Sequence, residues 1–362
     1  MKNSKFVFLA IALIVIVTAC KKGSTPTASL PPSPPSDTTS IQTIDAYVLN
    51  QGNYGHNNTT LSYYNFGTAT ASTDTFANKN SFHLGDTGSD FIIYGGKIYI
   101  VMNNSGELIV ANAATTAYID SISFQKGGVN KGPENIVGYG NHVFVSTTDD
   151  SVSVIDTAAL TVTKTIGVGA NPAQMVIVGT NLYVSNTGGY SAMYDSTISV
   201  IDLATLTQTT KIKVGINPGY IAADSAGYIY VACTGDYLSI LPTLVKVNIN
   251  TNTVATSASV PAGVVRYYNN KLYITGGGAG SPGVQVISPV DLSVLATSFI
   301  SDGTTVTLPY GLDIDPTNGD VYVTDAKNYT SNGTVFCFNS AGKKKFSFVV
   351  GPTPIKTVLI QN

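Results

Sequence analysis

The sequence predicts an all-β fold in which seven similar four-stranded sheets form a closed ring. Three observations lead to this expectation: the composition, a strand with a central aromatic residue that recurs seven times, and one displaced strand at the C-terminus. Only 11% of the 362 residues are charged, whereas 43% are hydrophobic and 35 are glycine. This composition is typical of a secreted protein made of strands and tight turns. A closed β structure of this length can be a single domain.

The recurring strand is short and apolar, and its central aromatic residues are separated by 39 to 52 residues. This interval matches the four-stranded blade of a β-propeller and is too long for leucine-rich or hexapeptide solenoids. A second strand follows every copy, and a strand entered through a turn precedes six of the seven copies. The central aromatic residues are Tyr47, Tyr99, Phe144, Tyr183, Tyr230, Tyr273 and Tyr322.

The missing preceding strand is found at the C-terminus. Residues 351–354, Gly-Pro-Thr-Pro, lead into the apolar segment 355–360, just as 169–172 lead into the strand before Tyr183. If 355–360 forms the innermost strand of the blade that Tyr47 begins, the ring closes without an exposed sheet edge. We therefore predict a seven-bladed β-propeller over residues 41–362. An open solenoid or two sandwiches would leave the final strand unexplained.

The first 40 residues predict export and a lipid anchor. Lys2 and Lys5 precede an apolar run, 6–17, that is too short to span a bilayer but suits the core of a signal peptide. The run ends in Val-Thr-Ala before Cys20, which resembles the lipobox of bacterial lipoproteins. That resemblance implies that residues 1–20 are a signal peptide and that Cys20 is lipidated. Residues 21–40, rich in Ser, Thr and Pro, predict an extended tether.

Charge and motif content disfavour several function classes. A net charge of −2 with one arginine, Arg266, disfavours a nucleic-acid partner. No paired histidine spacing, CxxC pair or GxSxG motif occurs, so we expect no metal ligands and no catalytic residues. Asp156 and Asp202 recur at equivalent strand ends, where they are expected to cap turns. Cys233 and Cys337 fall in non-adjacent blades, so they are expected to be free and buried.

The sequence motifs of the repeats resemble those of known families. LYVSNTGG, SVID and GxNP are similar to YVTN-type, YncE-like propellers. Residues 50–55, Asn-Gln-Gly-Asn-Tyr-Gly, and the stretch 186–195 are similar to propeller lipoproteins of Bacteroidetes. Some of those capture cobalamin at the cell surface together with a TonB-dependent outer-membrane transporter. The resemblance implies an outer-membrane lipoprotein with a corrinoid ligand, no further cofactor, and such a transporter as partner. Residues 21–24, Lys-Lys-Gly-Ser, differ from the acidic surface-export signal, so surface and periplasmic display both stay open.

Loop length predicts where a ligand binds. The loops between second and third strands are longest in blades four and five, and those of blades one and seven exceed those of blades two and three. They place tyrosines among Asn, Gly and Ser at one face, which suits a large amphipathic ligand. We predict a site on this face with residues 185–196 at its centre. The predicted ligand-binding residues are Asn53, Tyr54, Asn186, Tyr190, Tyr194, Asp236, Tyr237 and Tyr329.

Functions of different classes remain compatible with the sequence, because a propeller hosts many activities. One is a binding module that passes a small molecule such as cobalamin to an outer-membrane partner. Another is a structural or adhesive surface protein that contacts proteins or glycans. A propeller lactonase or dehydrogenase-like enzyme is a third alternative, which a central group of carboxylates around calcium would favour.

Overall fold

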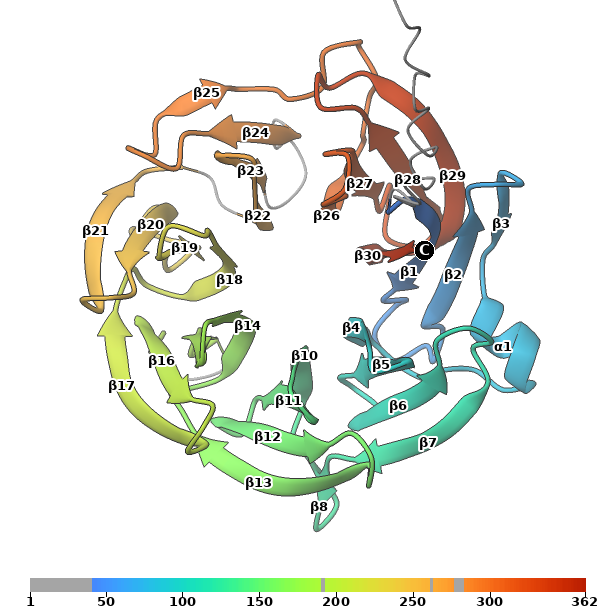
Figure 1. The fold of residues 1–362 in the computed structure, drawn as a ribbon, viewed down its shortest axis with the longest axis horizontal. Coiled ribbons are helices and arrows are strands. Elements are labelled where there is room, and N and C mark those ends of the chain that lie inside the picture. Colours follow the sequence, from blue (N-terminus) through green and yellow to red (C-terminus); the bar gives the residue numbers. More distant parts are fainter. Residues whose placement is uncertain (1–40, 190–192, 261–262, 277–282) are drawn as a thin grey trace, which may run out of the picture. The chain divides into compact units, whose positions relative to one another are not determined.

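The computed structural model describes residues 41–189, 193–260, 263–276 and 283–362. Seven four-stranded antiparallel sheets are arranged in a ring (Figure 1). The predicted seven-bladed β-propeller is confirmed. In every blade but the first, the four strands follow one another in the chain, from the innermost strand to the outermost.

The blades are numbered one to seven in chain order, and the strands of each blade run from the centre of the ring outward. The innermost strands are β30 (Pro354–Gln361), β4 (Gly88–Tyr94), β10 (Pro133–Tyr139), β14 (Pro172–Val178), β18 (Pro218–Ala223), β22 (Val265–Tyr268) and β26 (Pro309–Ile314). The second strands are β1 (Thr43–Asn50), β5 (Lys97–Met102), β11 (His142–Thr147), β15 (Asn181–Asn186), β19 (Tyr228–Cys233), β23 (Lys271–Thr275) and β27 (Val321–Asp325).

The third strands are β2 (Thr60–Asn65), β6 (Glu107–Asn112), β12 (Ser151–Asp156), β16 (Thr197–Asp202), β20 (Thr243–Asn248), β24 (Val284–Ile287) and β28 (Asn332–Phe338). The outermost strands are β3 (Thr70–Ser72), β7 (Tyr118–Ser123), β13 (Thr161–Gly167), β17 (Thr207–Lys213), β21 (Thr253–Ala258), β25 (Val294–Ala296) and β29 (Lys344–Pro352). A short hairpin, β8 (Gln125–Lys126) with β9 (Val129–Asn130), and one helix, α1 (Thr75–Asn80), complete the described elements.

Ring closure occurs as the sequence predicts. The C-terminal strand β30 pairs antiparallel with β1, and Tyr47 lies opposite Val358. Figure 1 shows β30, in red, beside β1, in blue. Because the last strand completes the first blade, neither end of the chain leaves an unpaired strand at the centre of the ring.

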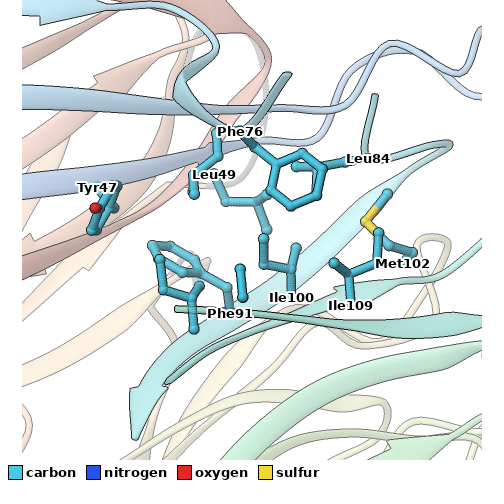
Figure 2. Close-up of a cluster of buried hydrophobic side chains, with 11 residues drawn as sticks. Tyr47, Leu49, Phe76, Leu84, Phe91, Ile100, Met102 and Ile109 are labelled. Carbon is cyan, nitrogen blue, oxygen red and sulfur yellow. The ribbon is translucent and has the colours of Figure 1, made fainter. Parts of the chain in front are cut away.

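The hydrophobic core lies between adjacent blades. Between blades one and two, Tyr47 and Leu49 of β1 pack with Phe91 of β4 and with Phe76 of α1 (Figure 2). The carboxylate of Asp74 accepts a hydrogen bond from the backbone N–H of Ala77, which starts α1 and directs Phe76 into this core. All seven central aromatic residues lie in second strands, as predicted, and all seven are buried. They therefore hold neighbouring blades together rather than contact a ligand.

Two predictions about individual side chains of the blades are also confirmed. The Asp156 carboxylate accepts hydrogen bonds from the N–H groups of Ala158 and Ala159, and Asp202 caps the equivalent turn. Cys233 and Cys337 are buried free thiols.

Candidate functional site

The two faces of the disc differ in their connections. The loop face carries the loops between second and third strands, described at residues 51–59, 103–106, 148–150, 187–189, 193–196, 234–242 and 326–331, together with the connections from each outermost strand to the next blade. The turn face carries the remaining turns and the start of β1 at Thr43. Of the loops between second and third strands that are described in full, those of blades one, five and seven are longer than those of blades two and three, as predicted.

Three adjoining hollows lie at the centre and on the loop face. The central channel, with a volume of about 170 Å³, is lined by innermost strands. The first-blade hollow, about 390 Å³, shares Gln51, Ser89, Glu134 and Tyr310 with the channel. The fourth-blade hollow, about 320 Å³, lies on the other side of Glu134. Glu134 lines all three hollows, so they meet at this residue.

A bulge in the innermost strands directs side chains into the channel. The pairing register shifts between Pro133 and Ile136 in β10 and between Pro172 and Met175 in β14, and β18 and β26 show the equivalent shift. Each of these strands starts with proline, which has no N–H for the ladder. A bulge turns the following side chains away from the regular alternation. Glu134 and Gln174 therefore line the channel directly after the proline turns.

Most charges of the channel wall are paired across blades. The ammonium group of Lys356 lies 2.7 Å from the Asp90 carboxylate, which also accepts a bond from the Asn135 amide. The guanidinium of Arg266 lies 3.1 Å from the Asp313 carboxylate. Because these pairs are largely buried, they hold the wall in one arrangement and leave little net charge on it.

Glu134 differs from these paired groups. Its carboxylate accepts a hydrogen bond of 2.8 Å from the Asn103 amide, and among the described residues no lysine or arginine forms an ion pair with it. Burial raises the pKa of Glu134 to about 7, although the bond from Asn103 acts in the opposite direction. The junction of the hollows thus contains a carboxyl group that changes charge near neutral pH.

Five predicted residues line the two outer hollows. Asn53, Tyr54 and Tyr329 line the first-blade hollow, where the Asn53 amide donates a 2.7 Å hydrogen bond to the Tyr329 carbonyl oxygen. Tyr194 and Tyr237 line the fourth-blade hollow, and their rings contact edge to face at 6.1 Å between centroids. Tyr54 and Tyr237 are 77% and 71% exposed. The five residues are therefore divided between two hollows on either side of Glu134.

Of the remaining three predicted residues, two do not line either outer hollow, and the third is not described. Asn186 is fully buried, and its amide bonds Thr197 and Ser199 within blade four, so it presents no polar group at the surface. Asp236 is half-buried and accepts hydrogen bonds from the N–H groups of its own loop up to Ile240, which hold the pKa of Asp236 well below its usual range. It fixes the loop rather than reaching into either hollow. Tyr190 lies outside the described residues.

The loop after β19 carries an apolar surface that the sequence analysis did not single out. Gly235 at φ +74° starts this loop, and a Cβ at this position would lie 1.9 Å from the Ile240 carbonyl oxygen. The tight turn leaves Leu238 and Leu241 92% and 70% exposed next to Tyr237. We call Tyr237, Leu238, Ile240 and Leu241 the apolar crest. It lies beside the fourth-blade hollow, which Tyr237 lines.

Sequence reasoning did not find the channel wall. Glu134 is one of only two glutamates in the chain, and it directly follows a proline at the start of an innermost strand. That position repeats from blade to blade, so aligning the proline turns could have identified it. Among the described residues, no group of three or more His, Cys, Asp or Glu side chains is arranged to hold a metal ion. The part of the chain that the structure describes also contains no helix of the length and hydropathy that a membrane span requires.

The comparisons with solved structures support the fold. A quinonprotein alcohol dehydrogenase-like protein of Bacteroides thetaiotaomicron VPI-5482 is 16% identical, with a TM-score of 0.63 over 88% of this chain and 78% of its own. Hydrazine synthase of Kuenenia stuttgartiensis is 17% identical, with a TM-score of 0.57 over 69% of this chain and 76% of that one. The computationally designed Ika8 protein is 11% identical, with a TM-score of 0.56 over 83% and 87%. At such identities the likeness concerns the fold alone.

The comparisons with sequences identify a family without a known activity. No curated protein matches the chain. One family model matches residues 45–350, which is nearly the whole propeller, and its description is a domain of unknown function, DUF5074. The chain therefore belongs to the DUF5074 family.

Proposed function

We propose that this propeller is a binding protein that captures a small molecule at its loop face. The observation that carries the proposal is the meeting of three hollows at Glu134, with exposed tyrosines on both sides. Tyrosine combines a flat apolar ring with a polar hydroxyl, and paired charges keep the wall between the hollows in one arrangement. Small-molecule sites combine such apolar contact with a few fixed polar groups.

A corrinoid is the first ligand to test. A corrin ring with amide side chains is large and amphipathic, and two hollows of about 390 and 320 Å³ on either side of one polar group suit separate parts of such a molecule. The similarity of residues 50–55 and 186–195 to cobalamin-capturing lipoproteins supports the same ligand. In this proposal the propeller passes its ligand to a TonB-dependent transporter and performs no chemistry on it.

Export and anchoring are part of the proposal. A diacylated Cys20 would hold the protein at the outer membrane, because two acyl chains suffice for stable attachment. The chain enters the propeller at Thr43 on the turn face. Replacement of Cys20 by Ala should release the protein into the soluble fraction, and unchanged membrane association would contradict the anchor.

A second candidate function is adhesion to another protein or to a glycan. The apolar crest favours this alternative, since Leu238 and Leu241 are strongly exposed, and exposed apolar patches mark interaction sites. If the crest alone mediates function, replacing Leu238 and Leu241 with Ser abolishes partner binding but leaves small-molecule binding unchanged.

The proposed capture is tested by thermal unfolding of the purified protein with a panel of compounds that includes cyanocobalamin. A bound ligand should raise the melting temperature further as its concentration increases. Tyr194→Ala with Tyr237→Ala should weaken binding of that ligand at least tenfold, since a tyrosine at a binding hot spot contributes about 2 kcal/mol. Tyr118→Ala, an exposed tyrosine of outermost strand β7, is the control and should bind normally. Equal affinity in the double variant would place the site elsewhere.

A further inference from the structure

Glu134 is a carboxyl group for which the described part of the protein provides no cation. The other acidic groups that line or border the channel have cationic partners: Asp90 is paired with Lys356, and Asp313 with Arg266. The only side-chain hydrogen bond described for Glu134 comes from the neutral Asn103 amide. A buried carboxylate without a positive partner is costly. The junction is therefore preorganised for a positive group supplied from outside.

We propose that the junction of the three hollows binds the protonated amino group of an organic ligand, with Glu134 as its carboxylate partner. This inference rests on the proposed capture of a small molecule at the loop face. It names organic amines as a ligand class for that face, which is an alternative to a corrinoid because the amide side chains of a corrin ring are neutral. The rest of the ligand occupies the first-blade hollow, whose volume of about 390 Å³ accommodates a ring with a short alkylamine chain.

The aromatic lining supports a cation at this place. Tyr310 lines both the channel and the first-blade hollow, and its ring contacts Tyr329 edge to face at 5.8 Å between centroids. The Tyr310 hydroxyl donates a 3.1 Å hydrogen bond to the Gln51 side chain, which fixes the ring. Tyrosine ring faces attract ammonium groups, and a carboxylate next to them adds a charge-assisted hydrogen bond. A neutral ligand of the same shape gains only the apolar part of these contacts.

The paired wall charges make the site selective for one positive charge. The Lys356 ammonium and the Arg266 guanidinium are already bound to carboxylates at 2.7 and 3.1 Å. An incoming cation therefore meets one unpaired carboxylate, and an incoming anion meets no free cation among the described wall residues. Binding of an ammonium group removes the cost of the unpaired carboxylate, whereas binding of a carboxylate ligand would increase it.

Binding of such a ligand should depend on pH through Glu134. Its carboxyl group is charged above a pKa of about 7 in the empty site, so an amine that stays protonated binds more tightly at pH 8 than at pH 5.5. Burial raises the pKa of the Tyr220 and Tyr310 phenols, which therefore stay neutral over this range. The charged groups that face the junction from the surrounding strands are Asp90, Lys356, Arg266 and Asp313.

The test compares tyramine with tyrosol, which carries a hydroxyl group where tyramine carries the amine. Isothermal titration at pH 8 should show that the wild-type protein binds tyramine at least tenfold more tightly than tyrosol, since hydrogen bonds to charged groups are the stronger ones. In Glu134→Gln, whose amide oxygen still accepts the bond from Asn103, the two compounds should bind equally. Glu107→Gln, which changes the only other glutamate, should keep the wild-type preference.

Three results would overturn the inference: equal binding of tyramine and tyrosol by the wild-type protein, no binding of either compound, or an unchanged preference in Glu134→Gln. If that variant fails to fold, the wild-type comparison at pH 5.5 decides instead, because the preference for tyramine should fall below threefold there. The proposed function fails separately, when no compound in the thermal panel binds to the protein. The two failures are therefore distinguishable.

Discussion

The channel wall and the loop-face rim are built on different principles. The wall consists of innermost strands whose charged side chains are buried and paired across blades, such as Lys356 with Asp90. The rim consists of loops with exposed tyrosines and the apolar crest, whose side chains have few fixed partners. Between them lies Glu134, which belongs to the wall by position but lacks a charged partner among the described residues. The comparison indicates that the wall is held in place by its own ion pairs, whereas the side chains of the rim face solvent.

The largest effect should come from removing the strand on which one side of the wall depends. Deletion of residues 351–362 removes β30, exposes the edge of β1 and eliminates Lys356. We expect loss of the single cooperative transition in scanning calorimetry. Truncation after Ile360, which removes two exposed residues, is the control and should melt like the full-length chain. A protein lacking 351–362 that still melts in one transition near the parent temperature contradicts the role of β30.

Breaking one ion pair in the channel wall should lower the free energy of unfolding less than deleting β30 does. It should still lower it more than breaking an ion pair at the surface. Lys356→Ala leaves the buried Asp90 carboxylate without its cation and should lower the free energy of unfolding by about 3 kcal/mol. Lys131→Ala removes a comparable contact of 2.8 Å to Asp149, whose side chain is 37% exposed, and should cost less than about 1 kcal/mol. Urea denaturation measures both. Equal losses would show that burial of the wall pair has no energetic consequence.

Replacement of Glu134 should instead stabilise the protein, and only above a certain pH. The folded-state pKa of about 7 lies above the ordinary value of 4.5, so ionisation destabilises the fold, and wild-type stability falls as pH rises between these values. Glu134→Gln lacks this loss. The variant should match the wild type at pH 4 and exceed it at pH 8 by up to about 3 kcal/mol, since one pKa unit corresponds to about 1.4 kcal/mol. Denaturation curves that differ equally at both pH values would contradict the raised pKa.

The smallest effect on stability belongs to the rim. Leu238→Ser with Leu241→Ser changes two strongly exposed side chains, so the free energy of unfolding should stay within about 0.5 kcal/mol of the wild type. Chemical denaturation checks this expectation. A loss above about 2 kcal/mol would mean that the crest packs against the propeller instead of facing solvent.

The sequence was sufficient for the fold because the fold depends on repeated features. The spacing of the central aromatics and the displaced strand 355–360 predict seven blades and their closure, and both predictions are confirmed. Loop lengths also indicated the face that carries Tyr54, Tyr194 and Tyr237, because an insertion between two strands is visible in the sequence. These features are local, so they can be read without knowing the packing.

The channel wall could not be predicted in the same way. Glu134 and Gln174 enter the channel because a bulge follows the proline turn. The proline turns are visible in the sequence, but the bulge decides which of the following side chains faces the channel. For Asn186 the prediction differs from the structure in the other direction, because a residue expected at the site lies inside a blade. It precedes a polar loop and was expected to meet a ligand, but it completes hydrogen bonds inside blade four. An asparagine at a strand end can serve either purpose, and only the packing decides.

The most direct test of a binding site at Glu134 is to locate the bound ligand through thiol protection. Ser89 lines both the channel and the first-blade hollow, while Gln361 is exposed at the far end of β30. The experiment uses protein with Cys20→Ser, in which Cys233 and Cys337 are the two native thiols that remain. Burial raises the pKa of both to about 12, so they react slowly with a disulfide reagent. Ser89→Cys then reports on the proposed site, and Gln361→Cys reports on an exposed position at the far end of β30. We predict that tyramine, or the panel compound with the largest thermal shift, slows modification at position 89 at least fivefold and leaves position 361 unchanged. Equal rates at position 89 with and without ligand, or protection only at position 361, would contradict a binding site at Glu134.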